Sequence, residues 1–283
     1  PLFINGLIRV LCNCQLSTAI NLMLGITLSS RYSIIRHLGG GGFAQTYLAE
    51  DSQLPGNHLC VVKQLKPQAT DPETLQVARR LFDTEAQVLY KLGNHDRIPR
   101  LFAYFEENQE FYLVQEFIEG HDLSEEIIPA SAAATTAGMK EDEVIIILQE
   151  ILEILDFVHQ QNVIHRDVNP RNILRRNRDG KLVLIDFGAV KEITTQITNP
   201  QYKNSLSVSI GTPGYMPSEQ SHGNPKLSSD IYAAGTIAIQ YLTGINPHQL
   251  PKDPDTEEII WQDKTSVSSE FAKILDKMVR YDF

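Results

Sequence analysis

The 283-residue chain has few cysteines, no basic excess and no long apolar run, and each shortage excludes a class of protein. Three cysteines cannot staple a chain of this length, so we expect no disulfide scaffold and a reducing compartment, the cytoplasm. The 25 Lys and Arg residues are outnumbered by 35 Asp and Glu residues, and the net charge of −10 argues against a nucleic-acid partner. No stretch approaches the ~20 apolar residues of a membrane span, so none is expected.

The first thirty residues have an uncertain status. Cys12 and Cys14 could bind a metal, but no second Cys/His pair has a matching spacing, so two small apolar residues is the preferred interpretation. A basic start, an apolar core and a cleavage site do not occur in the order that a secretory signal requires. The chain opens with Pro1 and Met23 is a candidate start, so we treat residues 1–30 as an N-terminal extension.

Residues 31–117 have a strand-like pattern with one helix. Short β-branched and apolar runs surround the glycines that follow Leu38, and a 3.6-residue apolar period predicts a helix over 74–92. Gly93 then provides a stop signal. The pattern predicts a small, mainly antiparallel β lobe with one helix.

Residues 118–283 are mostly helical in pattern. Helices are predicted over 141–160, 229–243 and 268–280, and the low-complexity residues 130–138 predict a loop. Acidic residues fill the first turn of the helix over 141–160, as the helix dipole favours. The sequence thus predicts an α+β chain, and its end at Phe283, inside or just after a helix, suggests a fragment.

The glycine cluster is a candidate phosphate-binding loop. Its members are Gly39, Gly40, Gly41 and Gly42, which lie between two strand-like runs. Glycines allow backbone N–H groups to approach a phosphate closely. No Gly-Lys-Ser/Thr follows, so this is not a P-loop, and no helix follows, so a dinucleotide-binding turn is disfavoured. An ordinary hairpin turn remains the alternative.

Charged and amide side chains follow several of the apolar runs. Lys63 ends a strand-like run and Glu85 lies between apolar neighbours of the predicted helix, so the two could form an ion pair that directs the ammonium at phosphates. Asp167 could accept a hydroxyl proton. Asn172 and Asp186 could hold Mg²⁺, which prefers oxygen ligands. Any one of them alone could be a solvated Lys or a turn residue.

The order of these motifs resembles the protein-kinase signature set. It runs from the glycine loop through the strand Lys and the helix Glu to His165-Arg166-Asp167, Asp186-Phe187-Gly188 and Gly211-Thr212-Pro213 over roughly residues 31–283. The residues within these motifs are similar to those of bacterial eukaryotic-like Ser/Thr kinases, particularly cyanobacterial ones. The resemblance implies a bilobal fold with lobes over 31–117 and 118–283, the second incomplete at its C-terminal end.

The resemblance also implies ATP and Mg²⁺ as cofactors and proteins with Ser or Thr hydroxyls as substrates. Lys63 would hold the α/β-phosphates with Glu85 as its anchor, and Asp167 would be the catalytic base. Asn172 and Asp186 would ligate Mg²⁺. Thr212 would line the acceptor site, and Asp230 would brace the catalytic loop. The remaining residues expected around the nucleotide are Leu38, Gly39, Gly40, Gly41, Gly42, Phe43, Ala44, Thr46, Val61, Gln115, Glu116, Ile118 and Asp122.

The sequence departs from the family pattern in ways that keep a second hypothesis open. Ala44 replaces a loop glycine, and Asn169 stands where Ser/Thr kinases usually have a Lys that steadies the transferring phosphate. Arg171 either supplies the missing charge or is a surface residue. The leading hypothesis is an active Ser/Thr kinase. The alternative is a pseudokinase or nucleotide-binding scaffold, and tyrosine specificity is a minor third interpretation.

Two further expectations concern the second lobe. The family partner of Glu219 would lie past Phe283, so Glu219 is expected to be buried and unpaired. Arg166 beside Asp167 suggests control by phosphorylation of the activation segment. The candidate acceptors there are Ser205, Ser207, Ser209 and, less so, Thr198.

Overall fold

The computed structural model describes residues 23–40, 44–65, 72–127, 138–188, 191–192 and 211–281. The chain divides into two compact units. The first is drawn from residues 1–86 and 100–117, and the second from residues 87–99 and 118–283.

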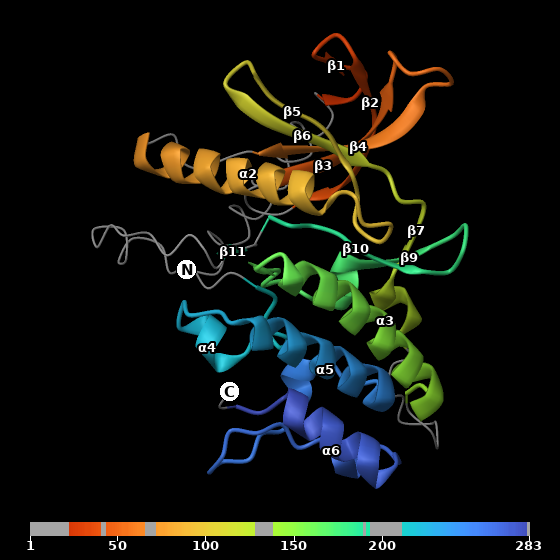
Figure 1. Cartoon of the computed structure of the whole chain (residues 1–283), viewed down its shortest axis with the longest axis vertical. Coiled ribbons are helices and arrows are strands. Elements are labelled where there is room, and N and C mark those ends of the chain that lie inside the picture. Colours follow the sequence, from red (N-terminus) through yellow and green to blue (C-terminus); the bar gives the residue numbers. More distant parts are fainter. Residues whose placement is uncertain are drawn as a thin grey trace, which may run out of the picture. The chain divides into compact units, whose positions relative to one another are not determined.

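The first unit is built on an antiparallel sheet of six strands in the order β1-β2-β3-β4-β6-β5 (Figure 1). The strands are β1 (Thr27–Leu28), β2 (Tyr32–Gly40), β3 (Ala44–Asp51), β4 (His58–Leu65), β5 (Leu101–Glu107) and β6 (Glu110–Glu116). Consecutive strands pair with one another except β4 and β5, which residues 66–100 separate in the chain and between which β6 lies. The predicted β lobe is therefore present.

The N-terminal strand belongs to this sheet. Leu28 pairs with Tyr32 across the β1–β2 turn, and the backbone N–H of Gly25 donates to the carbonyl of Ile34 at 2.9 Å. Met23 and Leu28 are 7% and 3% exposed and join the hydrophobic cluster on one face of the sheet. The described part of the extension, residues 23–30, thus contributes to the core of the first unit.

One long helix covers part of the sheet. Helix α2 (Pro72–Leu92) runs alongside the strands in Figure 1. Phe82 on this helix is buried, and its ring lies 5.8 Å from that of Tyr104 in β5 and 5.7 Å from that of Phe111 in β6. Aromatic packing at this separation fixes the helix on the strands. The predicted helix over 74–92 is confirmed, with its start two residues earlier.

The second unit is mainly helical, and its larger helices pack one on the next. Its helices are α3 (Glu141–Gln160), α4 (Ser218–Ser221), α5 (Leu227–Thr243) and α6 (Ser269–Met278), with the 3₁₀ turns η1 (Leu123–Glu126), η2 (Pro170–Asn172), η4 (Pro247–Gln249) and η5 (Gln262–Lys264). Helix α5 contacts both α3 and α6, and Figure 1 shows it between them. Almost every residue of α5 is buried, as expected of a central helix.

Short strands complete this unit. Strands β7 (Gly120–Asp122), β9 (Ile173–Arg176) and β10 (Leu182–Leu184) form one antiparallel sheet, and β8 (Val163–Ile164) pairs with β11 (Lys191–Glu192). They hold the loops that carry the candidate catalytic residues. In the part of the chain that the structure describes, no helix is long and apolar enough to cross a membrane.

Candidate active site

The ion pair suggested by the sequence is present in the first unit. The Nζ atom of Lys63 lies 2.8 Å from Oε1 of Glu85, and the two side chains are 16% and 7% exposed. Lys63 is in β4, where it pairs with Thr46 of β3 and Leu113 of β6, and Glu85 is on the helix that covers the sheet. The pair is strengthened by its partial burial, because screening by water and salt is weaker there.

The glycine-rich segment is described up to Gly40 and again from Ala44, whereas Gly41, Gly42 and Phe43 lie outside the described residues. Gly39 and Gly40 extend β2, and Ala44 opens β3. A Cβ atom on Gly40 would lie 2.6 Å from Oε1 of Gln45, whose side chain is held by His37 at 2.8 Å. The same Cβ atom would lie 2.7 Å from the backbone oxygen of Ala44, which cannot move aside as a side chain can, so glycine is favoured at position 40.

The described residues expected around a nucleotide belong to the strands of the first unit and to residues 118–122 of the second. In the first unit, Leu38 is on β2, Thr46 is on β3, and Val61 on β4 pairs with Gln115 of β6, the strand that ends at Glu116. In the second unit, Ile118 is buried, and the Asp122 carboxylate accepts from the backbone N–H of Ser124 at 2.9 Å. Asp122 thus caps η1, which fixes its side chain.

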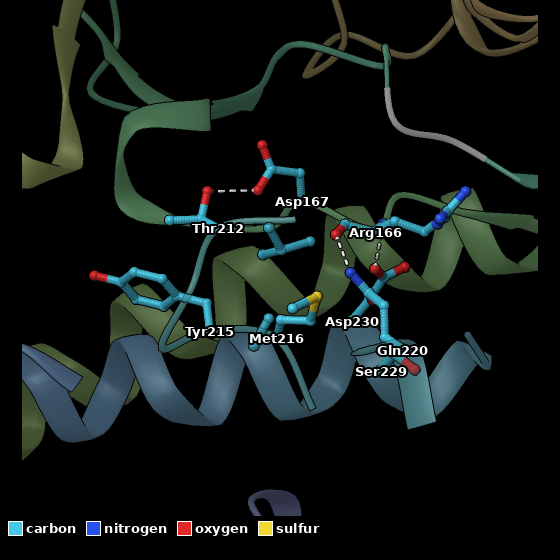
Figure 2. A pocket seen from close by; sticks show the side chains of 10 residues that line it. Arg166, Asp167, Thr212, Tyr215, Met216, Gln220, Ser229 and Asp230 are labelled. Atoms are coloured by element: carbon cyan, nitrogen blue, oxygen red, sulfur yellow. Dashed lines mark hydrogen bonds between the residues drawn. The ribbon is translucent and has the colours of Figure 1, made fainter. Parts of the chain in front are cut away.

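The carboxylate of Asp167 is held by three donors in the second unit. Its Oδ1 accepts from the Thr212 hydroxyl at 2.6 Å and from the Asn169 amide at 3.0 Å, and its Oδ2 accepts from the Asn172 amide at 2.9 Å. Figure 2 shows the Thr212 hydroxyl directed at this carboxylate. Asp167 is only partly buried. Its orientation is therefore set by neutral partners, and a hydroxyl acceptor could still approach it.

The backbone of this loop is held by a buried carboxylate from α5. Asp230 is 1% exposed, and its two oxygens accept from the backbone N–H groups of His165 and Arg166, both at 2.9 Å. Its Oδ2 also lies 2.8 Å from Nε2 of His159. Arg166 has a φ of 71°, a left-handed conformation that is unfavourable for a non-glycine residue. Asp230 stabilises that conformation, which confirms its expected role as a brace.

The side chains of Asn172 and Asp186 have oxygen atoms of the kind that bind a hard cation. The Nδ2 atom of Asn172 faces Asp167, donating to both its carbonyl and its carboxylate, so the amide oxygen points elsewhere. Asp186 is exposed, and its Oδ1 accepts from the backbone N–H of Gly188 at 3.3 Å. Amide and carboxylate oxygens suit Mg²⁺. The described residues contain no cluster of three or more His, Cys, Asp or Glu that could hold a metal ion.

Asn169 and Arg171, which follow Asp167 in the chain, have different environments. Asn169 is only 4% exposed, and its side-chain oxygen accepts from the backbone N–H of Arg171 at 3.0 Å. Arg171 is exposed, and within the described residues its side chain has no ion pair. The sequence-based interpretation of Asn169 as a loss of charge did not include its hydrogen bonds, of which one joins Thr212, 43 residues away, and the others join Asp167 and Arg171, two residues away.

The segment after Gly211 is tied to the same loop. Gln220 is 2% exposed, and its Nε2 donates to the carbonyl of Arg166 at 2.6 Å, as Figure 2 shows. A Cβ atom on Gly211 would lie 2.6 Å from that Nε2 and 3.0 Å from the same carbonyl. Glycine is therefore required at position 211. The sequence analysis missed Gln220 and also His159, although each directly adjoins an element it had singled out.

The expectation for Glu219 is wrong. Its side chain is partly exposed rather than buried, and Oε1 accepts from the Ser229 hydroxyl at 2.7 Å. Ser229 is itself fixed by accepting from the backbone N–H of Lys226 at 2.9 Å. Because the Glu219 carboxylate is partly solvated and accepts a hydrogen bond, it carries no large desolvation penalty in this chain.

The side chain of Arg166 has one buried nitrogen without a hydrogen-bond partner among the described residues. Its Nε is shielded from solvent and makes no hydrogen bond with any described residue, and burial lowers the pKa of the guanidinium. The candidate phosphorylation sites Thr198, Ser205, Ser207 and Ser209 lie outside the described residues. Control through Arg166 therefore stays a prediction.

Comparison with known proteins places these motifs in one family. The model for the protein kinase domain matches residues 32–283. Serine/threonine-protein kinase PknA of Nostoc sp. is 44% identical over 90% of this chain and 44% of its own length. Serine/threonine-protein kinase C of Synechocystis sp. is 46% identical over 90% of this chain and 47% of its own length. The chain thus spans about half the length of the curated relatives it matches, and the expected similarity to cyanobacterial kinases is confirmed.

A solved structure has the same fold. The kinase domain of PknI from Mycobacterium tuberculosis aligns with a TM-score of 0.64 and 24% identity, over 91% of this chain and 90% of that one. Together with the antiparallel sheet and the helical second unit, this confirms the predicted α+β, kinase-like fold. The chain belongs to the protein kinase family.

Proposed function

We propose that the chain is the catalytic domain of a protein serine/threonine kinase that uses ATP and Mg²⁺. The observation that carries the proposal is the Asp167 carboxylate, oriented by Asn169, Asn172 and Thr212 on a loop that Asp230 holds. The curated relatives from Nostoc and Synechocystis are named serine/threonine-protein kinases, which supports the same activity.

The reaction transfers one phosphoryl group. The oxygen of a Ser or Thr hydroxyl attacks the γ-phosphorus of ATP, the bond from that phosphorus to the bridging oxygen breaks, and ADP leaves with the electron pair. Asp167 accepts the hydroxyl proton. Such catalysis depends mostly on positioning and charge neutralisation, so the fixed orientation of the carboxylate matters.

The other site residues have proposed roles in binding. Lys63, held by Glu85 at 2.8 Å, would pair with phosphate oxygens. Asn172 and Asp186 would hold Mg²⁺, which supplies charge neutralisation at the phosphates when bound. The proposed nucleotide contacts are Leu38, Gly39, Gly40, Gly41, Gly42, Phe43, Ala44, Thr46, Val61, Gln115, Glu116, Ile118 and Asp122. Arg171 is proposed as a compensating charge, since it is exposed and lies four residues after the base.

The setting of the reaction is part of the proposal. The substrates would be proteins with Ser or Thr hydroxyls, with Thr212 beside the acceptor and no nucleic-acid partner. The lobes would cover residues 31–117 and 118–283. A cytoplasmic location fits the few cysteines, of which Cys60 is free in the described part of the chain.

The test is phosphate incorporation from labelled Mg-ATP into the purified chain and a generic basic protein. We expect incorporation on Ser and Thr, with a loss of at least a hundredfold in Asp167→Asn, since that change removes the base but keeps the shape. Asp255→Ala, which alters an exposed loop carboxylate, is the matched control. Equal incorporation by wild type and Asp167→Asn would refute the proposal. Nucleotide-dependent stabilisation without any transfer would instead identify a pseudokinase.

A further inference from the structure

The side chain of Asn169 contacts both the proposed base and the segment that faces it. Its Nδ2 lies 3.0 Å from the carbonyl oxygen of Asp167, 3.0 Å from Oδ1 of the same residue and 3.1 Å from Oγ1 of Thr212. Its Oδ1 accepts from the backbone N–H of Arg171 at 3.0 Å, which caps η2. Every polar atom of this buried amide is therefore used.

The hydrogens of this group form a closed arrangement. The Thr212 hydroxyl has one proton, and at 2.6 Å it is donated to Oδ1 of Asp167. The hydroxyl oxygen is then left with lone pairs, one of which accepts from the Asn169 amide. The amide has two protons for three nearby oxygens, so one of its bonds is shared. Asn169, Thr212 and the Asp167 carboxylate thus fix one another, and we call these three residues the amide clamp.

A second contact joins the same two segments. The Gln220 amide donates to the carbonyl of Arg166 at 2.6 Å, next to the residue that carries the carboxylate. Besides the bond from the Thr212 hydroxyl to Asp167, the segment that contains Thr212 is therefore attached to the catalytic loop by Asn169 and by Gln220. Both attachments are neutral amides, and both are almost fully buried.

We propose that Asn169 is a positioning residue that orients the base through the amide clamp and couples it to the acceptor-facing segment without any charge. The inference rests on the proposed kinase function. It follows that a cationic side chain at position 169 could not replace the hydrogen bonds that the amide makes. A Lys side chain donates but cannot accept, so Asn169→Lys would leave the Arg171 N–H without its cap. It would also replace two fixed bonds by a flexible stem.

The test separates positioning from mere folding. Asn169→Ala removes the amide of the clamp, and Thr212→Val removes its hydroxyl. Each variant should have a kcat roughly 10–100-fold lower, because a small misplacement of a reacting group has a cost of that order. KM for ATP should change less than about twofold. The double variant should be no slower than the slower single variant, because both changes break the same unit. Thr212→Ser keeps the hydroxyl and should restore at least half of the wild-type kcat.

Two more variants address the cap and the charge. Asn169→Asp keeps an acceptor for the Arg171 N–H but loses both donors and places a second carboxylate beside that of Asp167, where the amide nitrogen now lies 3.0 Å from Oδ1, so it should be slow and should melt below wild type. Asn169→Lys should be slower than wild type. Asn177→Ala, a change of an exposed Asn in the same unit, is the matched control.

The outcomes distinguish the inference from the function it rests on. Wild type that transfers no phosphate would overturn both. If the wild type is active, three results would overturn the clamp alone. These are multiplicative effects of Asn169→Ala and Thr212→Val on kcat, a wild-type kcat in Asn169→Asp, or a kcat of Asn169→Lys ten times that of wild type. A non-additive loss of kcat, rescued by Thr212→Ser, would support it.

Discussion

The buried carboxylate of Asp230 permits a quantitative prediction. Replacement by Ala removes the acceptor for two backbone N–H groups, those of His165 and Arg166, at a site that is 1% exposed. A buried donor that loses its partner costs about 1–3 kcal/mol, so the two together should reduce the free energy of unfolding by roughly 2–6 kcal/mol. That is a large part of the ~5–15 kcal/mol that holds a domain together.

The effect can be read from thermal unfolding. For a domain of this size, 1 kcal/mol corresponds to about 2–4 °C, so Asp230→Ala should melt at least roughly 4 °C below wild type. Asp230→Asn keeps one oxygen as an acceptor and should lose less. Asp255→Ala, at an exposed loop carboxylate, serves as the control. A melting temperature of Asp230→Ala within 2 °C of wild type would refute the reasoning that this side chain supports the catalytic loop.

Three more predictions concern the first unit. Glu85→Gln should lower phosphate transfer at least about tenfold, since the ammonium of Lys63 loses the negative charge that lies 2.8 Å from it, and unchanged steady-state rates would contradict this. Burial raises the pKa of the Cys60 thiol to about 11, so peptide mass spectrometry at pH 8 should find it unalkylated by iodoacetamide until the chain unfolds. The paired bonds of 2.8 and 2.7 Å from Arg31 lower the pKa of Asp51 below 3.8, so their stabilisation exists above about pH 4 and is lost as the pH falls through the folded value. Asp51→Asn should therefore melt lower than wild type at pH 7, with a difference that shrinks below pH 4; a constant difference would exclude this linkage.

Much of the architecture could be read from local patterns. The helix over 141–160 was predicted with its observed bounds, because its apolar period and the acidic first turn are both local signals. Strand β5 was missed, because it has apolar residues on both faces: Phe102 and Tyr104 are exposed while Leu101 and Ala103 are partly covered, which hides the two-residue alternation.

The limits at the candidate site have a different origin. The residues that carry charge were found from motif order, and the Lys63–Glu85 pair formed as expected. The bonds from Asn169 to Thr212 and from Gln220 to Arg166 were not foreseen, because neutral amides have no distinctive spacing and these partners lie 43 and 54 residues away. Glu219 was misjudged because its donor, Ser229, belongs to a helix that follows it. Such contacts follow from tertiary structure and leave little trace in the local sequence.

The small strand β1 has a consequence for where this domain can be cut. The family match begins at residue 32, after β1 has ended. A chain trimmed to that point would lose Met23 and Leu28 from the apolar cluster and uncover the side chains of Tyr32 and Ile34 beneath them. It would also remove the strand that pairs with Tyr32 and Ser33 and so extend the unpaired outer edge of β2, the kind of surface on which strands of other molecules add. A soluble, monomeric excised domain should therefore retain the residues from Met23 onward.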